Sequence, residues 1–148
     1  VMADAGGGNI INISSIAGLD GAPARAAYCA SKFGIVGLTK VLAHDLGPRG
    51  VRVNALCPGL IRTPLTERYF ADEDLVTGLP KVIPLGGAGT PNHVAQAALF
   101  LASSMSEYVT GVALPVDGGY LAARSFDTAR KPGSAFQARA DTVGAVSG

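Results

Sequence analysis

A helical segment between two short apolar runs constrains the fold of this chain more than any other feature. From residue 26 to residue 46, apolar side chains recur every three or four positions, which is the period of an α-helix. Residues 9–14 and 51–56 are nearly continuous apolar runs, typical of strands that are buried on both faces. A strand, a helix and a strand in this order predict a right-handed crossover in a parallel sheet. We therefore expect an α/β fold.

The remainder of the chain predicts fewer elements. Thr90 favours an N-cap and Pro91 the first position of a helix, so we predict a second main helix over residues 91–103, with Phe100 facing inward. Residues 111–116 form a third apolar strand pattern. Between residues 59 and 90 the periodicity is lost, and we expect one or two short helices in a segment that closes over a ligand.

The domain organisation follows from where the apolar pattern ends. Residues 1–121 are expected to form one partial domain, and residues 122–148, where apolar content falls, a disordered tail. Within the long helix, Gly34 and Gly37 cost about 1 kcal/mol each relative to alanine. We therefore expect them to lie where another backbone approaches closely, either that of the sheet or that of a subunit partner.

Composition excludes several classes of function. The net charge of +1, without a basic stripe, gives no reason to expect a nucleic-acid partner. No run reaches the ~20 apolar residues of a membrane span, and no signal-peptide pattern is visible, so we expect a cytoplasmic protein without a membrane partner. The two cysteines, Cys29 and Cys57, are expected to be free thiols. They form no ligand cluster with His44 or His93, so no metal is predicted.

The most informative chemical pair is Tyr28 and Lys32. Residues four apart share one face of a helix, and a fixed ammonium stabilises a phenolate and lowers its pKa toward neutrality. Taken alone, this spacing is more often a solvated helix turn. In an open parallel sheet, however, ligands bind beyond the carboxyl ends of the strands. Ser15 and residues 58–63 follow the first two strands and meet the start of the helix there, where they could polarise a carbonyl and deliver a proton.

Ser14 is the obvious competitor of Ser15. Side chains alternate along a strand, so the two hydroxyls should point to opposite faces and only one can serve this edge of the sheet.

Four short motifs, in this order, resemble those of the short-chain dehydrogenase/reductase family. They are Ser15, Tyr28-Cys29-Ala30-Ser31-Lys32, Pro58-Gly59-Leu60-Ile61-Arg62-Thr63 and Val116-Asp117-Gly118-Gly119. The resemblance covers about residues 8–120. It implies the C-terminal portion of a Rossmann-like doubly wound parallel sheet, with about three strands and two main helices. It further implies an NAD(P)-dependent oxidoreductase that interconverts a small-molecule alcohol and a ketone or aldehyde by hydride transfer.

The resemblance also implies roles for individual residues. The catalytic set is Ser15, which hydrogen-bonds the substrate oxygen, Tyr28, which exchanges a proton with it, and Lys32, which lowers the tyrosine pKa and holds the nicotinamide ribose. The residues expected to bind NAD or NADP are Tyr28, Lys32, Pro58, Gly59, Ile61 and Thr63, with Ile61 and Thr63 near the carboxamide. Members of this family commonly pair through the long helix, so a homo-oligomer, dimer or tetramer, is expected.

The chain also departs from the family pattern. Gly6-Gly7-Gly8 precedes a strand instead of following one, which predicts a turn and not a phosphate-binding loop. We therefore expect the N-terminal dinucleotide-binding half to be absent and the strand over residues 9–14 to present an unpaired edge. The alternative function is a truncated, non-catalytic remnant that acts only in subunit association. Asn54 is predicted to be a structural hydrogen-bonding residue, Asp117-Gly118-Gly119 a turn, and Cys57 a small buried side chain.

Overall fold

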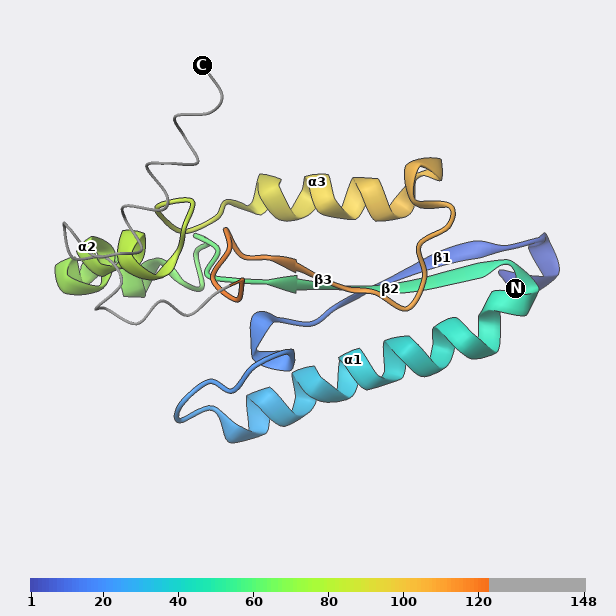
Figure 1. The fold of residues 1–148 in the computed structure, drawn as a ribbon, viewed down its shortest axis with the longest axis horizontal. Helices are drawn as coiled ribbons and strands as arrows, with labels where there is room; N and C mark the ends of the chain where they lie inside the picture. The colour runs from blue at the N-terminus through green and yellow to red at the C-terminus, as the bar shows by residue number, and fades with distance from the viewer. Residues whose placement is uncertain (123–148) are drawn as a thin grey trace, which may run out of the picture.

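The computed structural model describes residues 1–122 and shows a three-stranded parallel sheet between two helices. The strands are β1 (Gly8–Ile13), β2 (Val51–Pro58) and β3 (Ala113–Val116), in the order β1-β2-β3. Helix α1 (Ala26–Leu46) covers one face of the sheet and α3 (Pro91–Ala102) the other (Figure 1). The predicted α/β fold with parallel strands is confirmed. The predicted tail lies, apart from Ala122, outside the described residues.

The remaining elements are short and lie in the connections. They are α2 (Glu73–Val82) and the 3-10 helices η1 (Ala3–Ala5), η2 (Ile16–Gly18), η3 (Gly47–Arg49), η4 (Glu67–Ala71) and η5 (Ser104–Ser106). Of the predicted bounds, those of α1 are correct at both ends, whereas the strand and α3 bounds differ by one or two residues. The segment between residues 59 and 90 contains η4 and α2, as predicted, beyond the end of the sheet (Figure 1).

The central strand, β2, forms the core. Val53, Ala55, Leu56 and Cys57 have no solvent exposure. One buried cluster joins α1 to the sheet and consists of Ala43, Val51 and Val53, packed against Ile10, Leu42 and Leu46. Each fully buried aliphatic side chain contributes about 1.5–3 kcal/mol. Because β2 pairs with both neighbours, this burial also fixes where β1 and β3 end.

Helix α1 buries a narrow stripe and exposes the rest of its apolar side chains. Its buried residues are Val36, Thr39 and Ala43, whereas Phe33, Leu38 and Val41 are about half exposed. The region Ala26–Arg49 is long and apolar enough to cross a membrane by length and composition alone, a test that the core helix of a soluble protein can also pass. In this fold the same helix packs against β2.

For Gly34 and Gly37, close approach to the sheet is wrong, whereas approach to a subunit partner stays a prediction. A Cβ atom at either position would meet no other atom within 4 Å. The close approach occurs instead at Gly18, where a Cβ atom would lie 2.6 Å from the carbonyl oxygen of Lys32. Only a residue without a side chain therefore allows η2 to pack directly on α1.

Polar side chains from the sheet hold the end of α3. The Arg52 guanidinium donates hydrogen bonds to the carbonyl oxygens of Leu101 and Ser103, at 2.9 and 3.3 Å, and the Asn9 amide also donates to Leu101. A positive charge at a helix C-terminus complements the helix dipole. Leu101 is fully buried, but Phe100, which was predicted to face inward, is 36% exposed.

Asn54 has the structural role that was predicted. It is fully buried, its amide nitrogen donates to the carbonyl oxygen of Val109 at 2.9 Å, and its side-chain oxygen accepts from the N–H of Val112 at 3.1 Å. These two bonds attach the approach to β3 to the central strand.

Candidate active site

Two adjacent serines follow β1 and have different partners. The Ser15 side-chain oxygen accepts a hydrogen bond from the N–H of Ala17 at 3.1 Å and caps η2. Its own hydroxyl hydrogen is donated to no group within residues 1–122. Ser14 donates its hydroxyl hydrogen to the carbonyl oxygen of Lys32 at 2.8 Å. The hydroxyl of Ser14 is therefore committed to the packing of α1, and that of Ser15 keeps a donor.

Tyr28 and Lys32 lie at the start of α1, beside the end of β1. The Lys32 ammonium donates to the carbonyl oxygen of Ile13 at 3.1 Å and lies 5.6 Å from the centre of the Tyr28 ring. Tyr28 is 43% exposed, and its phenolic oxygen makes no hydrogen bond to any described residue. Helix spacing brings the two side chains together, and the bond to Ile13 attaches both to the edge of the sheet that the serines follow.

Cys57 lies beneath this edge. The residue has no solvent exposure, and burial raises the pKa of its thiol above the ordinary value, although hydrogen bonds with Ser14 and the Ser15 backbone act in the opposite direction. A buried thiol with a raised pKa is a poor nucleophile. The prediction that Cys57 is a small buried side chain is confirmed.

The segment after β2 is shaped by its own hydrogen bonds. The N–H of Gly59 donates to Val116, and the segment then pairs with Gly89 through bonds of 2.8 and 2.9 Å. A Cβ atom at Gly59 would lie 2.8 Å from the Cβ of Asp117, so this position requires glycine. The backbone of residues 58–63 is therefore held against β3 on one side and against Gly89 on the other.

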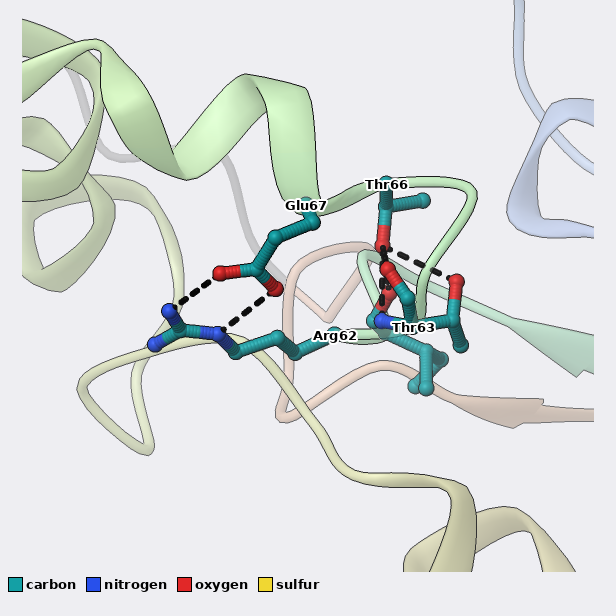
Figure 2. Close-up of polar contacts among 5 residues, drawn as sticks. Arg62, Thr63, Thr66 and Glu67 are labelled. Atoms are coloured by element: carbon teal, nitrogen blue, oxygen red, sulfur yellow. Dashed lines mark hydrogen bonds and ion pairs between the residues drawn. The ribbon is translucent and has the colours of Figure 1, made fainter.

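Thr66 closes this segment into a turn. Its hydroxyl donates to the carbonyl oxygen of Ile61 at 2.6 Å and accepts from the N–H of Thr63 at 2.9 Å (Figure 2). Thr66 was not among the predicted site residues. The available signal was local, since threonine hydroxyls commonly bond to nearby backbone groups in turns.

An ion pair joins the same turn to η4. The Arg62 guanidinium donates to both carboxylate oxygens of Glu67, at 3.1 and 2.6 Å (Figure 2). These hydrogen bonds hold the pKa of Glu67 below its usual value. Arg62 also lies over the Phe70 ring, 4.8 Å from its centre.

The structure separates two cavities that the sequence had led us to treat as one site. Tyr28 lines a surface depression of about 420 Å³ together with Ala24, Arg25, Ala26, Ala27, Arg68 and Tyr69. Ile61 lines a different cavity, of about 840 Å³, formed mainly by residues 84–89 and 115–119. Ser15 lines neither. The group of Arg25, Arg68 and Tyr69 was not predicted, because Arg25 is 44 residues from Tyr69 in the chain and only the fold brings them together.

The predicted turn at Asp117-Gly118-Gly119 is confirmed. Gly118 and Gly119 have φ values of +65° and +91°, and the Asp117 carboxylate accepts hydrogen bonds from the N–H groups of Gly119 and Leu121. Gly6 and Gly7, also at positive φ, precede β1 as predicted. Within residues 1–122, no group of three or more His, Cys, Asp or Glu side chains could hold a metal ion.

Comparisons with known proteins agree on the family. A family model described as enoyl-(acyl carrier protein) reductase matches residues 1–121. The 3-oxoacyl-[acyl-carrier-protein] reductase FabG of Chlamydia muridarum is 47% identical over 118 residues, which are 80% of this chain and 47% of that protein. The chain thus spans about half the length of the curated relatives it matches.

Solved structures give the same result. A gluconate 5-dehydrogenase from Burkholderia cenocepacia, in complex with NADP and tartrate, is 36% identical, with a TM-score of 0.79 over 83% of this chain and 48% of that one. A 4-hydroxyisoleucine dehydrogenase complexed with NADH is 39% identical, with a TM-score of 0.76 over 79% of this chain and 48% of that one. The chain belongs to the short-chain dehydrogenase/reductase family.

Proposed function

We propose that this chain is the catalytic half of an NAD(P)-dependent oxidoreductase that interconverts an alcohol and a ketone or aldehyde. The observation that carries the proposal is the hydrogen bond of Lys32, one helical turn after Tyr28, to the carboxyl end of β1, the strand that Ser15 follows with an unused hydroxyl donor. The similar proteins from Chlamydia muridarum and Burkholderia cenocepacia are a reductase and a dehydrogenase, which supports the same reaction class.

The proposed roles follow from the free hydrogen-bonding capacity of each group. Ser15 donates its unused hydroxyl hydrogen to the substrate oxygen and orients it. Tyr28, whose phenol is accessible and unpartnered, gives a proton to that oxygen in reduction and takes it back in oxidation. The positive charge of Lys32 favours the phenolate that remains after proton transfer.

The residues also fit the nicotinamide end of a dinucleotide. The Lys32 ammonium has three donors and uses one on Ile13, so two can hold the ribose hydroxyls. Pro58, Gly59, Ile61 and Thr63 form the fixed backbone segment proposed to lie along the nicotinamide. The bound cofactor would supply or accept the hydride. No strand-to-helix turn within residues 1–122 has the glycine-rich pattern of a pyrophosphate site.

The proposed partners are a small-molecule carbonyl or alcohol and a second copy of the chain. The exposed apolar residues of α1, Phe33, Leu38 and Val41, support association through this helix in a cytoplasmic homo-oligomer. We propose no nucleic acid or membrane partner.

The decisive experiment replaces the phenol of Tyr28. Oxidation of NADPH and NADH by the purified 148-residue chain is followed with 5-keto-D-gluconate and with the neutral thioester acetoacetyl-N-acetylcysteamine. Tyr28→Phe is expected to lower kcat about 10²- to 10⁴-fold, the usual contribution of a general acid, with an unchanged circular dichroism spectrum. Tyr108→Phe, at a fully exposed residue, is the matched control. Equal turnover by wild type and Tyr28→Phe would contradict the proposed role of the phenol, and two inactive proteins that assemble alike would favour the alternative of a remnant that acts in subunit association.

A further inference from the structure

Two arginines without a carboxylate partner lie beside Tyr28. Arg25 is the N-cap of α1 and Arg68 belongs to η4. None of the ion pairs within residues 1–122 includes either of them. The contrast with Arg62 is direct, since its guanidinium is neutralised by Glu67.

The two guanidinium groups converge on one oxygen. Arg25 donates to the Tyr69 phenol at 3.0 Å and Arg68 at 3.2 Å, and their guanidinium carbons lie 5.9 and 5.0 Å from the centre of its ring. These hydrogen bonds lower the pKa of Tyr69. Two like charges this close repel each other, and no acidic side chain among the described residues forms an ion pair with either of them.

The position of this cluster gives it a functional meaning. Arg25, Arg68 and Tyr69 line the same depression as Tyr28, together with the first residues of α1. The first turn of α1 contains no acidic residue, so the partial positive charge of the helix N-terminus adds to that of the arginines. The wall of the depression beside the accessible phenol is therefore positive.

We propose that Arg25 and Arg68 bind an anionic group of the substrate, a carboxylate or a phosphate, while its carbonyl or hydroxyl group reaches Tyr28. The inference rests on the proposed function and narrows its substrate class to oxo- and hydroxy-compounds that carry a negative charge. A guanidinium group matches both anions, because its planar set of donors can form two parallel hydrogen bonds to paired oxygens. The phenol of Tyr69, which accepts a hydrogen bond from each arginine, sets the spacing of the two guanidinium groups.

Binding is tested first, because it does not require turnover. Tartrate and glycerol 3-phosphate are titrated into the purified chain, each against a neutral compound of similar size, threitol and glycerol. Isothermal calorimetry gives the affinity, and arginine side-chain nitrogen resonances report the site. We expect saturable binding of at least one anion, perturbed resonances of Arg25 and Arg68, and no binding of threitol or glycerol. The anion that binds more tightly identifies a carboxylate or a phosphate substrate.

Charge-neutral variants locate the site. Arg25→Gln combined with Arg68→Gln is expected to weaken anion binding at least about tenfold, since a charge-assisted hydrogen bond typically supplies that much. Arg49→Gln is the matched control, because it removes the same charge at the far end of α1, where Arg49 lies 3.6 Å from Asp4. Arg25→Lys keeps the positive charge but loses the planar donors of the guanidinium group, so its affinity for the anion is expected to lie between those of wild type and the double variant. Circular dichroism checks that each variant is folded.

Kinetics separate failure of this inference from failure of the proposed function. In an active chain, the double variant should lower kcat/KM for 5-keto-D-gluconate by a larger factor than that for acetoacetyl-N-acetylcysteamine. The inference is overturned if anions and neutral compounds bind equally, or if Arg49→Gln weakens binding as much as the double variant. A chain that binds tartrate at these arginines but reduces neither compound would contradict the proposed function alone.

Discussion

Strand β2 and the segment from residue 59 to residue 90 are neighbours in the chain, yet their positions are fixed by different forces. Most of β2 is fully buried and pairs with a strand on each side. In the segment from residue 59 to residue 90, Ile83 is the one buried residue. The shape of this segment depends on surface contacts such as those of Thr66 and Glu67. The first region is held by burial, the second by replaceable polar contacts.

The difference would separate the proposed chemistry of the site from its proposed selectivity. Ser15 directly follows β1 and Lys32 bonds to the last residue of that strand, so both are positioned by elements that the core holds. Arg68 and Tyr69 lie on η4, where a substitution changes the local charge at little cost to stability. A fold of this design can keep one proposed reaction and change the compound that undergoes it.

The largest expected effect is in the core. Leu56→Ala is expected to lower the free energy of unfolding by about 2–5 kcal/mol, because it leaves a cavity at a fully buried position. Urea unfolding followed by circular dichroism measures the change. Leu65, in the segment from residue 59 to residue 90, is 79% exposed, and Leu65→Ala is expected to keep the free energy of unfolding within about 0.5 kcal/mol of wild type. Equal effects would remove the distinction between the two regions.

A smaller effect is expected at Asn54. Asn54→Ala leaves the N–H of Val112 without its partner and removes one of the two hydrogen bonds to the carbonyl oxygen of Val109, the other coming from Arg52, at a cost of about 1–3 kcal/mol. The same unfolding assay applies, with the exposed Asn92→Ala as control. A wild-type midpoint for Asn54→Ala would mean that the approach to β3 is held without this side chain.

The two cysteines compare burial directly. With a thiol-specific disulfide reagent, the half-buried Cys29 should react first, and Cys57 only as the chain unfolds. Burial raises the pKa of Cys57, so the unfolded chain releases this proton at a lower pH than the folded chain. The contribution of Cys57 to stability is therefore complete below its unfolded pKa and declines as pH rises toward its folded one. Rapid modification of both thiols in the folded chain would contradict the burial of β2.

The smallest effect is expected for the surface ion pair. Glu67→Gln should leave the unfolding midpoint within experimental scatter, since exposed pairs contribute little. Because Arg62 lowers the pKa of Glu67, any contribution is present above the ordinary glutamate pKa and is lost as pH falls through the lowered one. Unfolding at pH 7 and at pH 3 checks the sign. A loss comparable with that of Asn54→Ala would show that this polar contact is not replaceable.

The success of prediction from sequence follows the same division. The bounds of α1 could be read because its period and its Gly-Pro ending are local signals, and Asn54 because a buried strand allows few roles for an amide. The burial of individual residues on the faces of a helix was harder to predict from the sequence. Phe100 was misjudged, and so was the sheet as a neighbour of Gly34 and Gly37, because the neighbours that each helix face meets are not local information.

The arginine cluster shows the limit more clearly. Arg25 and Arg68 are unremarkable surface residues in the sequence, and only the path of the chain from β2 through η4 brings both to Tyr69. The separation of Tyr28 from Ile61 into different cavities also depends on side-chain placement, which topology alone does not give. Topology predicts which edge of a sheet carries a site, but not which side chains share a cavity there.

The register of β1 has a consequence for evolution as well as for folding. Ile13 pairs with Leu56, and the N–H of Ser14 donates to the carbonyl of the same leucine. A slip of one residue would exchange the environments of Ser14 and Ser15, so that the hydroxyl with an unused donor and the hydroxyl bonded to Lys32 would change places. An insertion or deletion in β1 would thus inactivate the proposed enzyme while every motif residue stayed present, a kind of loss that a comparison of motifs alone would miss.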